Sequence, residues 1–113
     1  MEQPKTSDAK GLRDKAMLEV LYATGIRVSE LVSLHVDDVN LPFEYIRCTT
    51  GSKSRMIPIG TKAKEALWEY LKKGRVQLIH NPEETVLFLN YGGKKMTRQG
   101  FWKIVKNYAE EAG

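Results

Sequence analysis

The sequence predicts an α+β domain that is mostly α, with helices packed around a small antiparallel β-hairpin or sheet. Long stretches repeat their apolar residues with the spacing of one helix face, whereas the strand-like runs are few and short. The predicted order is helix, helix, hairpin, helix, short strand, helix, which differs from the regular alternation that builds a parallel sheet. With 113 residues, of which 42% are hydrophobic, we expect one globular unit with a modest core.

The first two predicted elements are helices joined at a tight junction. A helix is expected over 8–24, with Arg13 on its polar face, and Gly25 suits a left-handed C-terminal cap. A short second helix is expected over 28–34, which places Arg27 at the junction between the two helices. The apolar positions of the first helix are Leu12, Ala16, Met17, Leu18, Val20, Leu21 and Ala23.

A β-hairpin is predicted next. The segment 43–48 is rich in aromatic and β-branched residues, and 56–59 is a second short apolar run. Between them, residues 49–52 contain turn-forming types, so the hairpin carries Lys53 and Arg55 near its tip.

The last third of the chain predicts a helix, a short strand and a final helix. Thr61 is the expected N-cap of an amphipathic helix that Gly74 ends. A strand is expected over 86–89 with a turn over 90–93, and a last helix starts at Thr97. That helix turns Phe101, Ile104, Val105 and Tyr108 inward.

Composition narrows the function classes. Lys and Arg outnumber Asp and Glu by 18 to 14, and this net charge of +4 mildly favours a polyanionic partner. Cys48 is the single cysteine, which excludes a disulfide within the chain and a multi-cysteine zinc site. We see no metal-ligand spacing, Gly-rich phosphate loop, signal peptide or membrane-length apolar stretch. We therefore expect a cytoplasmic protein without metal or cofactor, and a linker or chain boundary at residues 1–7.

Arginine is the residue type here that could carry chemistry, because charge stabilisation by arginines can support phosphoryl transfer without a metal. The segment 23–31, Ala-Thr-Gly-Ile-Arg-Val-Ser-Glu-Leu, resembles the first arginine motif of tyrosine recombinases (the phage integrase family, Xer-like). Segments 51–59 and 96–102 are similar to the catalytic β-hairpin and the next core helix of that family. The resemblance covers nearly the whole chain in the family's order, and it implies a recombinase catalytic-domain fold.

The resemblance also implies an activity. In this family a tyrosine hydroxyl attacks a DNA phosphate, a phosphotyrosine intermediate forms, and a 5′-hydroxyl later reverses it, so site-specific recombination or integration needs no cofactor. Arg27 matches the first catalytic arginine, which binds the scissile phosphate, and Glu30 matches the acidic residue that supports this arginine. From residue type alone, Arg27 would more often be a surface arginine at a helix start, and Glu30 could equally be a surface carboxylate.

This sequence departs from the family pattern at two places. The family's catalytic lysine falls at Thr50, which cannot protonate a leaving group near neutral pH. Either Lys53 substitutes for it through a shifted hairpin register, or the parent protein is impaired. Residues 8–113 are expected to be the N-terminal part of a catalytic domain that lacks the nucleophile, so the chain by itself is expected to be inactive. None of its five tyrosines, at 22, 45, 70, 91 and 108, matches the nucleophile position.

Duplex DNA is the expected partner, and further basic residues are candidates to contact it. The DNA-binding candidates are Lys53, Arg55, Lys95, Thr97 and Arg98. Each has an ordinary alternative, either a solvated hairpin tip or an N-cap beside surface charges. The parent is expected to act as a tetramer on DNA, and this chain to be a monomer.

For the other residues that could take part in catalysis or binding, we predict structural positions. His35 and His80 are predicted to lie at the surface or in loops. The core is the predicted place of Tyr22, Tyr70 and Tyr108, and the core or an interface that of Trp68 and Trp102.

Three alternative functions are considered. They are a non-catalytic DNA-binding or regulatory module, which Thr50 favours, an RNA-binding protein, and a type IB topoisomerase. The sequence identifies neither the target DNA site nor which of two reactions the parent protein catalyses, integration of a mobile element or resolution of chromosome dimers.

Overall fold

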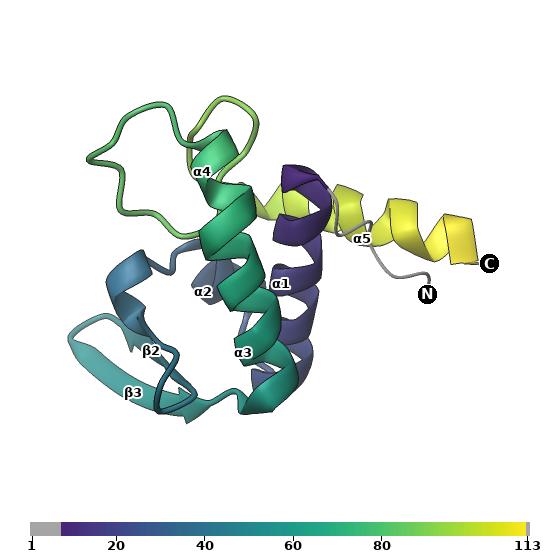
Figure 1. Cartoon of the computed structure of the whole chain (residues 1–113). Coiled ribbons are helices and arrows are strands. Elements are labelled where there is room, and N and C mark those ends of the chain that lie inside the picture. Colours follow the sequence, from purple (N-terminus) through teal and green to yellow (C-terminus); the bar gives the residue numbers. More distant parts are fainter. Residues whose placement is uncertain (1–7, 113) are drawn as a thin grey trace.

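The computed structural model describes residues 8–112 and has the predicted mostly helical α+β architecture (Figure 1). The expected linker at residues 1–7 lies outside the described residues. The helices are α1 Ala9–Thr24, α2 Val28–Val32, α3 Gly60–Glu69, α4 Arg75–Leu78 and α5 Arg98–Ala112, with a 3-10 turn η1 Val36–Asp38 and a π-helical turn η2 Tyr70–Gly74. The strands are β1 Val39–Asn40, β2 Tyr45–Thr50 and β3 Lys53–Pro58.

Helix α1 is the centre of the fold. It packs against α3 and η2 on one side, and its buried face includes Leu12, Ala16, Met17 and Val20. As predicted, Gly25 ends it in the left-handed conformation, with φ 66° and a backbone N–H that donates to the carbonyl oxygen of Leu21 at 2.9 Å.

The helix that follows the sheet differs from its predicted bounds at both ends. It begins at Gly60 with Ile59 as N-cap, so Thr61 lies inside the helix and is not its cap. It also continues through Gly74 into α4 and ends after Leu78. Gly74 is buried against α1, where an added Cβ would lie 3.1 Å from the Cβ of Leu12. Glycine therefore serves close helix packing at this position and does not end the helix.

The sheet has the antiparallel order β1-β2-β3, and its hairpin lies beside the helices (Figure 1). Thr50 pairs with Lys53, so the turn between β2 and β3 consists of Gly51 and Ser52, and Gly51 has φ 65°. Both strands reach further toward the turn than predicted. On β2, Ile46 and Cys48 are buried.

The predicted strand over 86–89 is wrong. The backbone forms isolated bridges there, and Leu87, Phe88 and Leu89 are fully buried without joining a sheet. Long side chains satisfy much of the backbone: Tyr70 donates its hydroxyl to the carbonyl oxygen of Leu87 at 2.7 Å, and Arg75 donates to that of Val86 at 2.7 Å. An apolar run of strand length is consistent with several buried conformations, and its partners decide which forms.

A buried ion pair connects α1 with its surroundings. Arg13 was expected on the polar face of α1, but it is 4% exposed beside Asp14, which is 0% exposed. An Nη atom of Arg13 lies 2.9 Å from an Asp14 carboxylate oxygen, and the other donates to the carbonyl oxygen of Leu89 at 3.1 Å. Tyr108 of α5 donates its hydroxyl to the same carboxylate at 3.0 Å. The pair therefore links α1, the segment around Leu89 and α5.

The predicted burial of the aromatic residues is confirmed for some of them and wrong for others. Tyr70 is buried, and its ring stacks on Phe88 at a centroid distance of 5.5 Å. Tyr108 is partly buried, whereas Tyr22 is 93% exposed, so its predicted core position is wrong. Trp68 and Trp102, which were predicted in the core or an interface, are both exposed, so the core alternative is wrong for them. None of the helices in residues 8–112 is both long enough and apolar enough to span a bilayer.

Candidate functional site

The start of α2 and the β2–β3 hairpin enclose a pocket of about 420 Å³. It is lined by Arg27, Glu30, Thr50, Lys53, Ser54 and Arg55. Most residues that the sequence singled out for chemistry thus meet in one place, although those at α2 and those of the hairpin are at least 20 positions apart in the chain. Three cationic side chains and one carboxylate line the pocket, so its charge is positive and suits an anion.

The carboxylate of Glu30 accepts hydrogen bonds from three other residues of this pocket. Its Oε1 accepts a hydrogen bond from the backbone N–H of Arg27 at 3.0 Å, which stabilises the first turn of α2. Its Oε2 accepts from the hydroxyl of Thr50 at 2.9 Å and from Nη1 of Arg55 at 3.1 Å. The hydrogen bonds from Arg27, Arg55 and Thr50 lower the pKa of Glu30 to about 2, so it is ionised at neutral pH.

Arg27 and Lys53 are the cations in this pocket that remain available to a ligand. Both side chains are exposed. Within residues 8–112, neither the guanidinium of Arg27 nor the ammonium of Lys53 forms a hydrogen bond or ion pair. Arg27 stands at the N-cap of α2, where the bond from its backbone to Glu30 holds the main chain and leaves the side chain free.

Arg55 differs from these two, because its charge is already paired. Its Nη1 and Nη2 approach the two carboxylate oxygens of Glu30 at 3.1 and 3.4 Å, a two-pronged contact. This contact raises the pKa of the Arg55 guanidinium above its ordinary value. The sequence did not predict the pairing, because 25 residues separate the partners and no local spacing connects them.

A second group of predicted residues lies at the start of α5. Lys95, Thr97 and Arg98 line a smaller pocket of about 280 Å³ together with Ser29, Val32, Ser33 and Met96. Thr97 caps the helix, which was the ordinary alternative to a DNA contact, because its Oγ1 accepts a hydrogen bond from the backbone N–H of Gly100 at 2.9 Å. The ammonium of Lys95 donates to the hydroxyl of Ser33 at 3.1 Å. Since α2 contributes residues to both pockets, it lies between the two candidate groups.

The remaining titratable residues form no comparable site. His35 and His80 are exposed, as predicted, and His35 Nδ1 lies 2.8 Å from the hydroxyl oxygen of Thr85. Residues 8–112 contain no cluster of three or more His, Cys, Asp or Glu side chains that could hold a metal ion. Cys48 is buried, and burial raises the pKa of its thiol.

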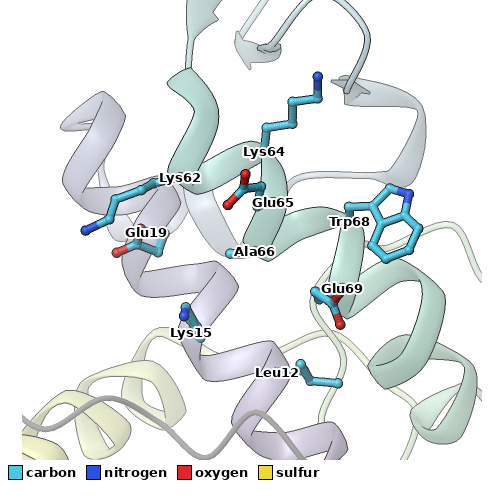
Figure 2. Close-up of a pocket in the computed structure, with 9 residues that line it drawn as sticks. All are labelled: Leu12, Lys15, Glu19, Lys62, Lys64, Glu65, Ala66, Trp68 and Glu69. Carbon is cyan, nitrogen blue, oxygen red and sulfur yellow. The ribbon is translucent and has the colours of Figure 1, made fainter.

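A larger pocket, of about 710 Å³, lies elsewhere. Figure 2 shows its lining side chains coming from α1, among them Lys15 and Glu19, and from α3, among them Lys62, Glu65 and Trp68. Charges of both signs line it, so it does not favour a ligand of one charge. None of the predicted site residues lies there.

Comparisons with known proteins assign the chain to a family. The family model described as "Phage integrase family" matches residues 1–113. The chain belongs to the phage integrase family. Among curated members of this family, the tyrosine recombinase XerC of Herpetosiphon aurantiacus is 57% identical over 109 residues, which are 96% of this chain and 36% of that protein. The tyrosine recombinase XerD of Oceanobacillus iheyensis is 49% identical over 111 residues, or 96% of this chain and 37% of that protein. The chain thus spans a little over a third of the length of these relatives.

Solved structures of Xer recombinases have the same fold. The crystal structure of XerA recombinase matches with a TM-score of 0.81 and 26% identity over 93% of this chain and 38% of that chain. XerH site-specific recombinase, solved bound to its difH substrate, matches with a TM-score of 0.77 and 22% identity over 93% of this chain and 30% of that chain. The predicted family and fold class are therefore confirmed.

Proposed function

We propose that the protein containing this chain carries out site-specific DNA recombination or integration, by strand breakage and rejoining through a phosphotyrosine intermediate. One observation carries the proposal: the free guanidinium of Arg27 and the free ammonium of Lys53 share a pocket whose carboxylate, Glu30, is already paired. Two unpaired cations beside a neutralised carboxylate suit the oxygens of a phosphate diester. The names of the relatives, tyrosine recombinases XerC and XerD, support the same reaction.

The residues of the pocket then have distinct tasks. Arg27 binds the scissile phosphate and stabilises the charge that develops on its oxygens, a contribution worth roughly 10²- to 10³-fold in rate per donor. Glu30 holds the backbone of Arg27 in place. Lys53 is the candidate to protonate the departing 5′-oxygen, because Thr50 stands where the family has its lysine and donates its hydroxyl to Glu30.

Duplex DNA is the proposed partner, and the second pocket extends the contact. Lys95, Thr97 and Arg98 would bind a neighbouring backbone phosphate and set the orientation of the duplex without reading its sequence. Assembly of the parent as a tetramer, a monomeric state for this chain and a cytoplasmic location stay predictions. So does the division at residue 8, with 8–113 as the N-terminal part of a tyrosine recombinase catalytic domain.

A second function, a non-catalytic DNA-binding module, is favoured by one specific observation. The hydroxyl of Thr50 is bound to Glu30 at 2.9 Å, so the position of the family's general acid holds a residue that cannot release a proton near neutral pH. If Lys53 does not replace it, the scaffold binds DNA without cutting it. The two functions share the binding step and differ in the covalent step.

The binding step is tested on the chain itself. Fluorescence anisotropy with a labelled duplex, competed by single-stranded RNA of the same length, should show salt-sensitive preference for the duplex. Arg27→Ala should weaken binding and lower the slope of log affinity against log salt by ~0.9. Lys72→Ala is the matched control, because it removes one exposed positive charge that lines neither pocket. Preference for RNA would reject DNA as the partner, and an Arg27→Ala variant that binds like the control would reject Arg27 as a phosphate contact.

The covalent step separates the two functions and requires the longest protein that the gene encodes. A suicide duplex, nicked so that the cut strand is lost, is incubated with that protein and with its Thr50→Lys and Lys53→Ala variants. Covalent capture by the unmodified protein, abolished in Lys53→Ala, supports the recombinase with Lys53 as acid. Capture by the Thr50→Lys variant alone supports the binding module, because one restored lysine then revives a scaffold that no longer cuts.

A further inference from the structure

Arg55 of the β2–β3 hairpin contacts Glu30 more extensively than any other side chain in the pocket does. Both terminal nitrogens of its guanidinium approach the two oxygens of Glu30, at 3.1 and 3.4 Å. The side chain of Arg55 is 52% exposed and that of Glu30 is 13% exposed. An ion pair this exposed contributes little to the stability of a fold, so its effect should be sought in the pocket it lines.

The position of the Arg55–Glu30 pair indicates how it affects the pocket. Glu30 lines the same pocket as the free cations Arg27 and Lys53, and its carboxylate is also bound to the backbone N–H of Arg27. Unpaired, this carboxylate would repel a phosphate bound between the two cations. Its removal would leave the backbone of Arg27 without its acceptor. Glu30 is therefore needed to hold the backbone of Arg27, but its negative charge disfavours a bound phosphate. A cation that stays paired with Glu30 removes this repulsion and keeps the hydrogen bond to Arg27.

We propose that Arg55 is a positioning residue that neutralises Glu30, leaving Arg27 and Lys53 as the cations that contact a DNA phosphate. This assignment rests on the proposed DNA-binding function and changes the predicted role of Arg55 from a direct DNA contact to an indirect one. Thr50 belongs to the same arrangement, because its hydroxyl reaches Glu30 from β2 as Arg55 does from β3. Both strands of the hairpin are thus held to α2 through one carboxylate.

The salt dependence of DNA binding distinguishes the two roles of Arg55. A side chain that contacts a phosphate releases counterions, so its removal lowers the slope of log affinity against log salt by ~0.9, whereas a neutralising residue leaves the slope unchanged. We expect Arg55→Gln to bind the labelled duplex about fivefold more weakly, the effect of one bare charge near the phosphate in water, with the wild-type slope. Lys72→Gln serves as the control for a lost surface charge outside the pocket.

Two further variants complete the test. Glu30→Gln with Arg55→Gln restores the net charge of the pocket and should return most of the lost affinity at the wild-type slope. Glu30→Gln alone frees Arg55 for the phosphate, so its slope should steepen by ~0.9. This single variant leaves Arg55 in place and tests the assignment even if Arg55→Gln misfolds, which melting curves would reveal.

The outcomes separate this inference from the function on which it rests. A chain that binds duplex DNA through Arg27, but whose Arg55→Gln and double variants both lose ~0.9 of slope, would show that Arg55 contacts the phosphate directly and would overturn the inference alone. An unchanged slope in Glu30→Gln would overturn it too. A wild-type chain without duplex preference would reject the proposed function first, and the inference with it.

Discussion

Replacing Asp14 by alanine should destabilise the fold severely, because it leaves the charge of Arg13 buried without a partner. Asp14 is 0% exposed and Arg13 is 4% exposed, and their closest N–O distance is 2.9 Å. Removing one partner of such a pair costs roughly 3–5 kcal/mol. The entropy of unfolding of a 113-residue chain is roughly 0.24 kcal/mol per kelvin, so the Tm should fall by about 13–21 °C.

Thermal unfolding followed by circular dichroism or calorimetry measures this directly. Tyr108→Phe removes a hydroxyl that donates to Asp14 at 3.0 Å and should cause a smaller loss of about 1–3 kcal/mol, since the aspartate keeps its arginine. Asp37→Ala is the control, because this aspartate is exposed and should change stability by less than about 0.5 kcal/mol. If Asp14→Ala lowers the Tm no more than Tyr108→Phe does, the argument from an unpaired buried charge is wrong.

Two further predictions concern the cap of α1 and the ionisation of Glu30. Gly25→Ala forces a side chain into a conformation with φ 66° and should cost about 1–2 kcal/mol, measured as a lower denaturant midpoint at unchanged slope; an unchanged midpoint would contradict it. Because the folded-state pKa of Glu30 is about 2, below its ordinary value of 4.5, its contribution to stability is complete above pH 4.5 and is lost as the pH falls toward 2. The difference in Tm between wild type and Glu30→Gln should therefore shrink over that range, whereas a difference independent of pH would count against the pairing.

Much of the candidate site could be predicted from the sequence. Arg27 and Glu30 were placed correctly relative to the helix junction, because the glycine that ends α1 is a local signal. Thr50 was expected in the hairpin turn and lies at the end of β2, next to the turn at Gly51. The resemblance to the phage integrase family then indicated that these elements meet. What it could not indicate was the pairing of Arg55 with Glu30, which depends on side-chain geometry across 25 residues.

The sequence by itself determined the end of α1 at Gly25, the hairpin, the position of Arg27 and the family. The tertiary structure alone decided that a helix passes through Gly74, that 86–89 is buried without joining a sheet, and that Arg13 is inside the fold. The physical reason is the same in each case. Periodicity and capping act between residues a few positions apart, whereas glycine packing, buried backbone groups and buried charges are decided by partners that are distant along the chain.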